Sequence, residues 1–249
     1  MGGYGSFAYF YDRLTRNVPY EDMARQIERY TERFGGRKDI LLDLACGTGS
    51  LSERLAGLGF DVIGVDSSEE MLNCALDKKF DSGLPIQYLR QDMRSLDMFG
   101  TIDVTVCSLD GINHLENKED VLKVFERVSL FCDPAGLFIF DVNTLHKHRD
   151  VLADNAFIYS LGDVYCGWQN EYSPEDDSVR IFLDIFEEEN GKYTRYSEEF
   201  GEIYLSHEDI VSLLDKAGMT VLAVYDGYSD EPLNESSERA VYVCKKVNR

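Results

Sequence analysis

Residues 41–52 read LLDLACGTGSLS. An almost continuous apolar run, DILLDLA at residues 39–45, precedes the two glycines, and Leu51, Leu55 and Leu58 follow on one face of a helix. Strand, glycine turn and helix in this order form the usual context of a loop that binds a phosphate or a cofactor. The stretch therefore predicts a cofactor site at the end of the first strand of an α/β sheet.

The alternation of strands and helices continues along the chain. Further strands are expected at residues 60–66, 85–92, 101–108 and 136–143. Between them, Ser67 and Glu70 have the spacing of a capping box, and Val121, Phe125, Val128 and Cys132 form one helical stripe. Strands that alternate with helices predict a parallel sheet with right-handed crossovers.

The pattern changes after Asn155. Residues 178–205 have the composition of paired strands, and Asn190-Gly191 is a strong signal for a hairpin turn. A final helix with Ser206 as its N-cap and two strands, at 219–225 and 239–246, complete the chain. The sequence thus predicts an antiparallel β insertion in an α/β protein.

Net charge and cysteine usage exclude several classes of partner. A formal net charge of -21 opposes binding to nucleic acid or to an anionic membrane, both of which need a basic surface. The six cysteines are widely spaced, form no Cys-x-x-Cys pair and follow no secretory signal. We therefore expect a cytoplasmic protein with reduced thiols and with neither a nucleic-acid nor a membrane partner.

The glycine turn lacks one feature of a dinucleotide site. Such sites need a third glycine three residues after the second, and here that residue is Ser52. An acid, Asp43, stands near the end of the strand instead. Its carboxylate would repel a pyrophosphate but suits the ammonium group of S-adenosylmethionine.

Two more acids follow at strand ends. Asp66 ends the second strand, where a carboxylate can accept hydrogen bonds from ribose hydroxyls, and Asp92 follows the third, where an adenine amino group would lie. Asp66 alone would also suit a nicotinamide enzyme. The three acids together with the glycine turn favour S-adenosylmethionine as the cofactor.

With these motifs the sequence resembles the class I S-adenosylmethionine-dependent methyltransferases. LLDLACGTGSLS is similar to their first motif, VIGVDSSEEML to their second and RQDMRSL to their adenine-contacting segment. The resemblance implies a Rossmann-like α/β fold: a mostly parallel seven-stranded sheet, its last strand antiparallel, with helices on both faces. Ala45 is a departure, since many relatives have glycine there.

The resemblance also implies how the chain is divided and what binds the cofactor. Residues 1–36 would form a helical lid, 37–150 and 204–249 the core, and 151–203 an antiparallel insertion over the active site. Tyr11 would lie near the sulfonium and Tyr20 near the methionine carboxylate. The implied cofactor contacts are Tyr11, Tyr20, Asp43, Ala45, Gly47, Gly49, Asp66, Ser67, Met71, Asp92, Met93 and Cys107. Cys46 is expected to be an inert side chain.

The acceptor is expected near the loop CSLDGINHL at residues 107–115, because the carboxyl end of the fourth strand borders the cleft. His114 is the candidate catalytic base, together with Tyr11, although His114 could instead orient the loop or cap a helix. Asp110 and Asn113 could equally position an acceptor amine. The Asp/Asn-Pro-Pro-aromatic motif of nucleic-acid amino-methyltransferases is absent.

Four further side chains are candidates for the acceptor pocket or for a metal site. Trp168 and Tyr165 could line the acceptor pocket or pack in the core. His146-x-His148 supplies only two ligands in a stretch that looks flexible, so we expect no metal.

The sequence thus predicts an enzyme that transfers a methyl group from S-adenosylmethionine to a small-molecule acceptor, with an amine nitrogen favoured. It would be a monomer or a homodimer. Two alternatives remain open: an NAD(P)-dependent oxidoreductase, and a non-catalytic protein that binds S-adenosylmethionine.

Overall fold

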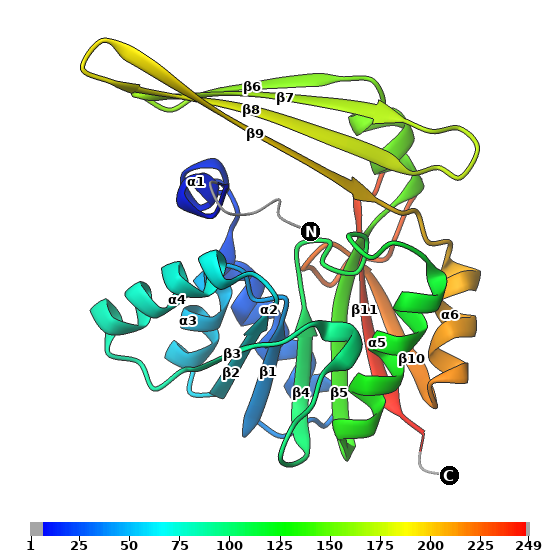
Figure 1. Cartoon of the computed structure of the whole chain (residues 1–249). Helices are drawn as coiled ribbons and strands as arrows, with labels where there is room; N and C mark the ends of the chain where they lie inside the picture. The colour runs from blue at the N-terminus through cyan, green and yellow to red at the C-terminus, as the bar shows by residue number, and fades with distance from the viewer. Residues whose placement is uncertain (1–6, 248–249) are drawn as a thin grey trace.

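A seven-stranded sheet forms the centre of the computed structural model, which describes residues 7–247 (Figure 1). The strand order is β10-β11-β5-β4-β1-β2-β3, and β11 runs antiparallel to the other six strands of this sheet. The strands are β1 Ile40–Leu44, β2 Asp61–Asp66, β3 Gln87–Arg90, β4 Ile102–Cys107, β5 Cys132–Asn143, β10 Met219–Asp226 and β11 Arg239–Lys246. The expected mostly parallel sheet with an antiparallel last strand is confirmed.

Helices cover both faces of this sheet because successive strand residues point to opposite sides. α2 and α3 pack Ile27 and Leu55 against one face, and α5 and α6 pack Phe125 and Leu214 against the other. The helices are α1 Phe7–Leu14, α2 Tyr20–Arg33, α3 Ser50–Gly57, α4 Glu69–Ser82, α5 Lys118–Phe131 and α6 His207–Lys216, with the short turns η1 Met93–Ser95 and η2 Lys147–Leu152.

A separate four-stranded antiparallel sheet crosses above the carboxyl ends of the parallel strands, and α1 lies beneath it (Figure 1). Its strands are β6 Ala156–Ser160, β7 Val164–Tyr172, β8 Val179–Glu189 and β9 Lys192–Glu202. Asn190 and Gly191 make the expected turn between β8 and β9, with φ angles of 53° and 75°. The predicted antiparallel insertion is therefore confirmed.

Helix α1 packs under the antiparallel sheet rather than on the parallel one. Phe7 and Phe10 are buried in one apolar cluster with Ile181 and Leu183 of β8. Leu14 is partly buried against the same cluster, so the apolar face of α1 packs on the inserted sheet. Residues 1–6 of the expected lid lie outside the described residues.

Several predicted boundaries differ from the structure. Ser68, not Ser67, caps α4, since its hydroxyl accepts from the amide of Met71. Cys132 is the extended C-cap of α5 and begins β5 instead of belonging to the helix, and Pro134 disfavours helical backbone at Asp133 just after it. Residues 146–148, expected to be flexible, form the N-cap and the first two residues of the helical turn η2.

Two observations concern the chain as a whole. No helix among residues 7–247 is long and apolar enough to span a membrane. All six cysteines are free thiols, in agreement with the sequence-based interpretation.

Gly64→Ala tests how closely β2 and β3 pack, because a Cβ at Gly64 would lie 2.5 Å from Cε1 of Tyr88. Overpacking of this kind should lower the free energy of unfolding by about 1–3 kcal/mol. Urea denaturation measures the change. Gly57→Ala is the matched control: no atom lies within 4 Å of its Cβ position, and it should be neutral or stabilising by up to about 1 kcal/mol. Equal stability of both variants would contradict the packing.

Candidate active site

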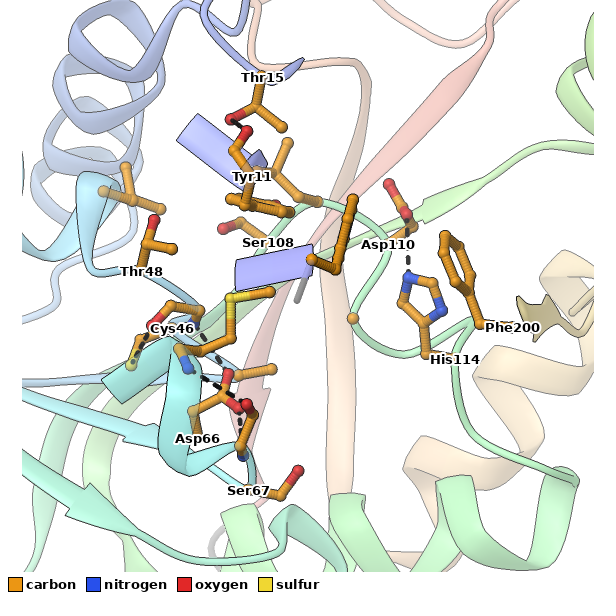
Figure 2. A pocket seen from close by; sticks show the side chains of 18 of the residues that line it. Tyr11, Thr15, Cys46, Thr48, Asp66, Ser67, Ser108, Asp110, His114 and Phe200 are labelled. Atoms are coloured by element: carbon orange, nitrogen blue, oxygen red, sulfur yellow. Dashed lines mark hydrogen bonds and ion pairs between the residues drawn. The ribbon is translucent and has the colours of Figure 1, made fainter. Parts of the chain in front are cut away.

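A cleft of about 510 Å³ lies between the carboxyl ends of the parallel strands, α1 and the inserted sheet (Figure 2). Figure 2 shows Cys46 and Asp66 on one side and His114 and Phe200 on the other. Most predicted site residues line it, namely Tyr11, Tyr20, Asp43, Ala45, Gly47, Asp66, Ser67, Met71, Asp92, Met93 and His114. Gly49 and Cys107 do not.

The glycine turn has left-handed backbone at three alternate positions. The φ angles of Ala45, Gly47 and Gly49 are 58°, 53° and 76°. Alanine in this conformation costs about 1–2 kcal/mol, which explains why glycine suits the position of Ala45. Gly49 is needed for packing, since a Cβ there would lie 2.3 Å from the Tyr88 hydroxyl.

Asp66 fixes the turn to β2. Its carboxylate accepts from the amides of Gly47 and Ser68, each at 2.8 Å. Burial raises the pKa of Asp66, although these amide bonds oppose the shift. The carboxylate lines the cleft at the end of β2.

Asp43 is a buried carboxylate beside the same turn. Ser52 Oγ donates to it at 2.5 Å, so the residue in place of a third glycine supports the strand-end acid. Burial raises the pKa of Asp43 to about 7. Within residues 7–247 no cationic side chain pairs with it. A cationic ligand would therefore find an unopposed carboxyl group here.

Asp92 has a partner that the sequence did not indicate. Arg94 Nη2 pairs with it at 2.6 Å, and Arg94 Nη1 lies 3.1 Å from Asp120 Oδ2. Hydrogen bonding to Arg94 lowers the pKa of Asp92. Asp92, Met93 and Arg94 all line the cleft.

Neither cysteine near the turn has the properties of a nucleophile. Burial raises the pKa of both Cys46 and Cys107 well above the ordinary value, so neither forms a thiolate at neutral pH. Cys107 is fully buried against Gly111, and Ser108 lines the cleft after it. The expected inert role of Cys46 agrees with this environment.

Helix α1 is bound on two sides. Asp12 accepts from Thr48 Oγ1 at 2.7 Å and pairs with Lys78 of α4 at 2.6 Å. Arg13 pairs with Asp163 of the inserted sheet. These contacts hold Tyr11 between the two sides of the cleft, as Figure 2 shows.

His114 lies at the other side of the cleft. Its Nε2 is 3.5 Å from Oδ2 of Asp110, and its ring packs edge-on to Phe200 with centroids 5.3 Å apart. Burial alone would lower the pKa of His114, but Asp110 and Glu202 raise it overall. His114 Nδ1 has no hydrogen-bond partner among the described residues.

Glu202 is a site residue that the sequence did not reveal. It lines the cleft at the end of β9 and is only 4% exposed. Asn143 Nδ2 donates to its Oε2 at 2.7 Å, and Nε2 of the buried His148 lies 3.2 Å away. Glu202 belongs to an acidic hairpin, in which most glutamates would be expected at the surface. It is buried in the cleft only because the chain returns to the core at this residue, and no local sequence pattern indicates that.

The remaining candidates divide between structural and cleft positions. Asn113 is fully buried and bonds the backbone of Ile203 and Asn143, so it holds the loop and is not free for an acceptor. Trp168 lines the cleft, whereas Tyr165 is exposed and does not.

Asp110, His114 and Glu202 have possible ligand atoms within 4.8 Å of one another. The guanidinium of Arg239, 2.5 Å from Asp110, already supplies a positive charge there. Burial opposes ionisation of Asp110, but Arg239 and His114 hold its pKa well below the usual range.

Comparison with known proteins identifies the family. Residues 41–136 match the model of a methyltransferase domain. Bacillus subtilis YqeM, which carries the provisional name of a methyltransferase, is 34% identical over 98% of this chain and 97% of its own. An S-adenosylmethionine-dependent methyltransferase structure from Clostridium acetobutylicum is 33% identical, with a TM-score of 0.89 over 98% of this chain and 99% of that one.

The chain is a class I S-adenosylmethionine-dependent methyltransferase. Its cofactor is therefore S-adenosylmethionine. This identification replaces both alternatives from the sequence, the nicotinamide oxidoreductase and the non-catalytic binding protein.

More distant methyltransferases act on different acceptor atoms. A glycine/sarcosine N-methyltransferase of Parasynechococcus marenigrum is 27% identical over 96% of this chain and 84% of its own. A ubiquinone biosynthesis O-methyltransferase of Colwellia psychrerythraea is 33% identical over 51% of this chain and 50% of its own. The family thus identifies the methyl donor and not the acceptor.

Lys78→Met in this methyltransferase should loosen α1. A partly exposed ion pair contributes about 0.5–1 kcal/mol, so amide hydrogen exchange across residues 7–14 should accelerate about twofold to fivefold. Mass spectrometry of the exchanged protein measures the change. Lys79→Met, on the next residue of α4, is the control. If both variants exchange at the same rate, the Asp12–Lys78 pair does not hold the helix.

Proposed function

We propose that this methyltransferase transfers a methyl group to an amine nitrogen of a small molecule. The observation that carries the proposal is the composition of the cleft around His114. Asp110, Glu202 and the adjoining Asp141 are carboxylates, and Arg239 is the permanent cation that pairs with two of them. The excess of negative charge favours an acceptor that arrives as an ammonium ion.

The aromatic side chains of the cleft support the same acceptor. Tyr11, Phe200 and Trp168 line it, and Tyr159 lies beside Trp168 with ring centroids 6.3 Å apart. Aromatic faces attract cations and exclude water. An N-methyltransferase among the relatives, which acts on glycine and sarcosine by its name, is consistent with such a site.

The opposite side of the cleft suits the donor. Asp43, which lacks a cationic partner in the described chain, would receive the ammonium of S-adenosylmethionine, and Tyr20 would contact the carboxylate. Asp66 would accept from the ribose hydroxyls, and Asp92 with Met93 would contact the adenine. The bound cofactor supplies a methyl group activated on a sulfonium.

In this proposal the protein aligns the acceptor and removes its proton. Methyl transfer is an in-line displacement, so positioning and exclusion of water contribute most of the acceleration. Tyr11, held by α1, would border the reacting centre. His114, with Asp110 at Nε2, would accept or direct the proton that the amine must lose before transfer. Helix α1 would act as a lid that opens for cofactor exchange.

Cofactor affinity should depend on pH through Asp43. Burial raises the pKa of Asp43 to about 7 in the free protein, so at lower pH the ammonium of the cofactor must displace a proton to bind. S-adenosylmethionine should therefore bind roughly 20-fold more tightly at pH 7.5 than at pH 5.5, since a carboxyl group with a pKa of about 7 is mostly ionised at the higher pH and mostly protonated at the lower. Calorimetric titration across this range measures the effect.

Asp43→Asn should weaken binding and remove this pH dependence. Asp92→Asn is the control, because hydrogen bonding to Arg94 lowers the pKa of Asp92 and leaves it ionised throughout the range. If the affinity for S-adenosylmethionine still depends on pH in Asp43→Asn, a group other than Asp43 causes the dependence.

The acceptor class can be tested directly. Release of adenosylhomocysteine should occur with small primary and secondary amines and not with hydroxyl compounds of matched shape. Glu202→Gln should raise the KM of an amine at least tenfold, since loss of a buried charge opposite a cation costs about 1.5–3 kcal/mol. Affinity for S-adenosylmethionine should not change.

Two controls accompany the acceptor test. Glu199→Gln replaces an exposed glutamate of the same strand and should leave the KM unchanged. EDTA separates an amine site from a metal site at Asp110, His114 and Glu202: turnover that needs an added divalent ion, or transfer to hydroxyl compounds alone, would overturn the proposal.

A further inference from the structure

Two consecutive residues of the loop after β4 have left-handed backbone without being glycine. The φ angles of Leu109 and Asp110 are 54° and 57°. Leucine rarely adopts this conformation, although aspartate does so more often, and two such residues in succession require support from the surroundings. The turn they form lies directly before His114 and directs Asp110 toward its ring.

The support comes from one buried carboxylate. Asp141, fully buried near the end of β5, accepts from the amide of Leu109 at 2.9 Å and from the amide of Asp110 at 2.7 Å. Its oxygens also accept from the Tyr228 hydroxyl at 2.6 Å and from Arg239. Four donors thus converge on a side chain that does not line the cleft.

Arg239 connects this carboxylate to the active site. One of its nitrogens binds Asp141, and Nη2 binds Oδ1 of Asp110 at 2.5 Å. Oδ2 of Asp110 then faces Nε2 of His114 at 3.5 Å. Asp141 therefore holds the backbone of Asp110 directly, by accepting from its amide, and holds the side chain of Asp110 indirectly, through Arg239.

We infer that Asp141 is a positioning residue of the acceptor site. It holds the strained Leu109–Asp110 turn, and through that turn it orients Asp110 toward His114. It touches neither donor nor acceptor. The inference relies on the proposed function only in taking the His114 side of the cleft as the acceptor side.

Asp141→Asn tests the inference, because asparagine keeps the volume but has one acceptor oxygen for the two amides. We expect kcat/KM for the acceptor amine to fall about 100-fold, while the Kd for S-adenosylmethionine stays within threefold. The pKa of His114, followed by NMR of its ring nitrogens, should fall because Asp110 no longer faces it. This spectroscopic readout needs no acceptor, so it separates a failure of the inference from a failure of the amine proposal.

A rescue experiment distinguishes two ways in which Asp141 could act: by holding the strained Leu109–Asp110 turn, or by pairing with the charge of Arg239. Leu109→Gly combined with Asp141→Asn should have a kcat/KM at least tenfold higher than that of Asp141→Asn alone, because glycine adopts positive φ freely. Leu109→Gly alone is measured as the reference for the double variant. No recovery in the double variant would mean that Asp141 acts only by pairing with Arg239.

A matched buried acid controls for general destabilisation. Asp103, near the opposite end of β4, is 5% exposed and accepts from Arg37 and from the amide of Ile40, so Asp103→Asn should affect folding but neither acceptor KM nor the His114 pKa. Tyr228→Phe removes a single bond to Asp141 and should lower kcat/KM threefold to tenfold even if Asp141→Asn does not fold. An unchanged His114 pKa and kcat/KM in Tyr228→Phe and Asp141→Asn would overturn the inference.

Discussion

Parallel pairing of neighbouring strands is the constraint on which the site depends. β1, β2, β3, β4 and β5 all end at the same edge of the sheet, so the residues that follow them meet although they are far apart in sequence. Asp43, Asp66 and Asp92 reach one cleft in this way. The bond from the Gly47 amide to Asp66 then fixes the glycine turn to the second strand.

The donor half of the cleft could be predicted because its signals are local. A strand, a glycine turn and an acid at a strand end are each encoded within about ten residues, and the parallel sheet brings them together. The cofactor and the fold followed from LLDLACGTGSLS and the acids after it. Errors at this level were small, such as Ser67 for Ser68 as the cap of α4, because neighbouring serines have the same capping chemistry.

The acceptor half could be predicted only in part. His114 was recognised from its loop, but Glu202, Arg239 and Asp141 become its neighbours through the return of β9 to the core and the antiparallel pairing of β11 with β5. Those are contacts between distant segments, and no local pattern encodes them. Left-handed backbone at Leu109 is equally hidden, since leucine rarely adopts it.

Phe200 and Glu202 lie at the end of β9, the last strand of the inserted sheet, where the chain passes back into the core. The proposed donor contacts that line the cleft belong to segments of the first hundred residues, whereas these two side chains belong to the insertion. Strand β8 of the insertion also packs on Phe7 and Phe10 of α1, the helix that carries Tyr11. For protein engineering, an exchange of the β8–β9 hairpin between two such enzymes should therefore include α1, so that the helix and the sheet above it stay matched.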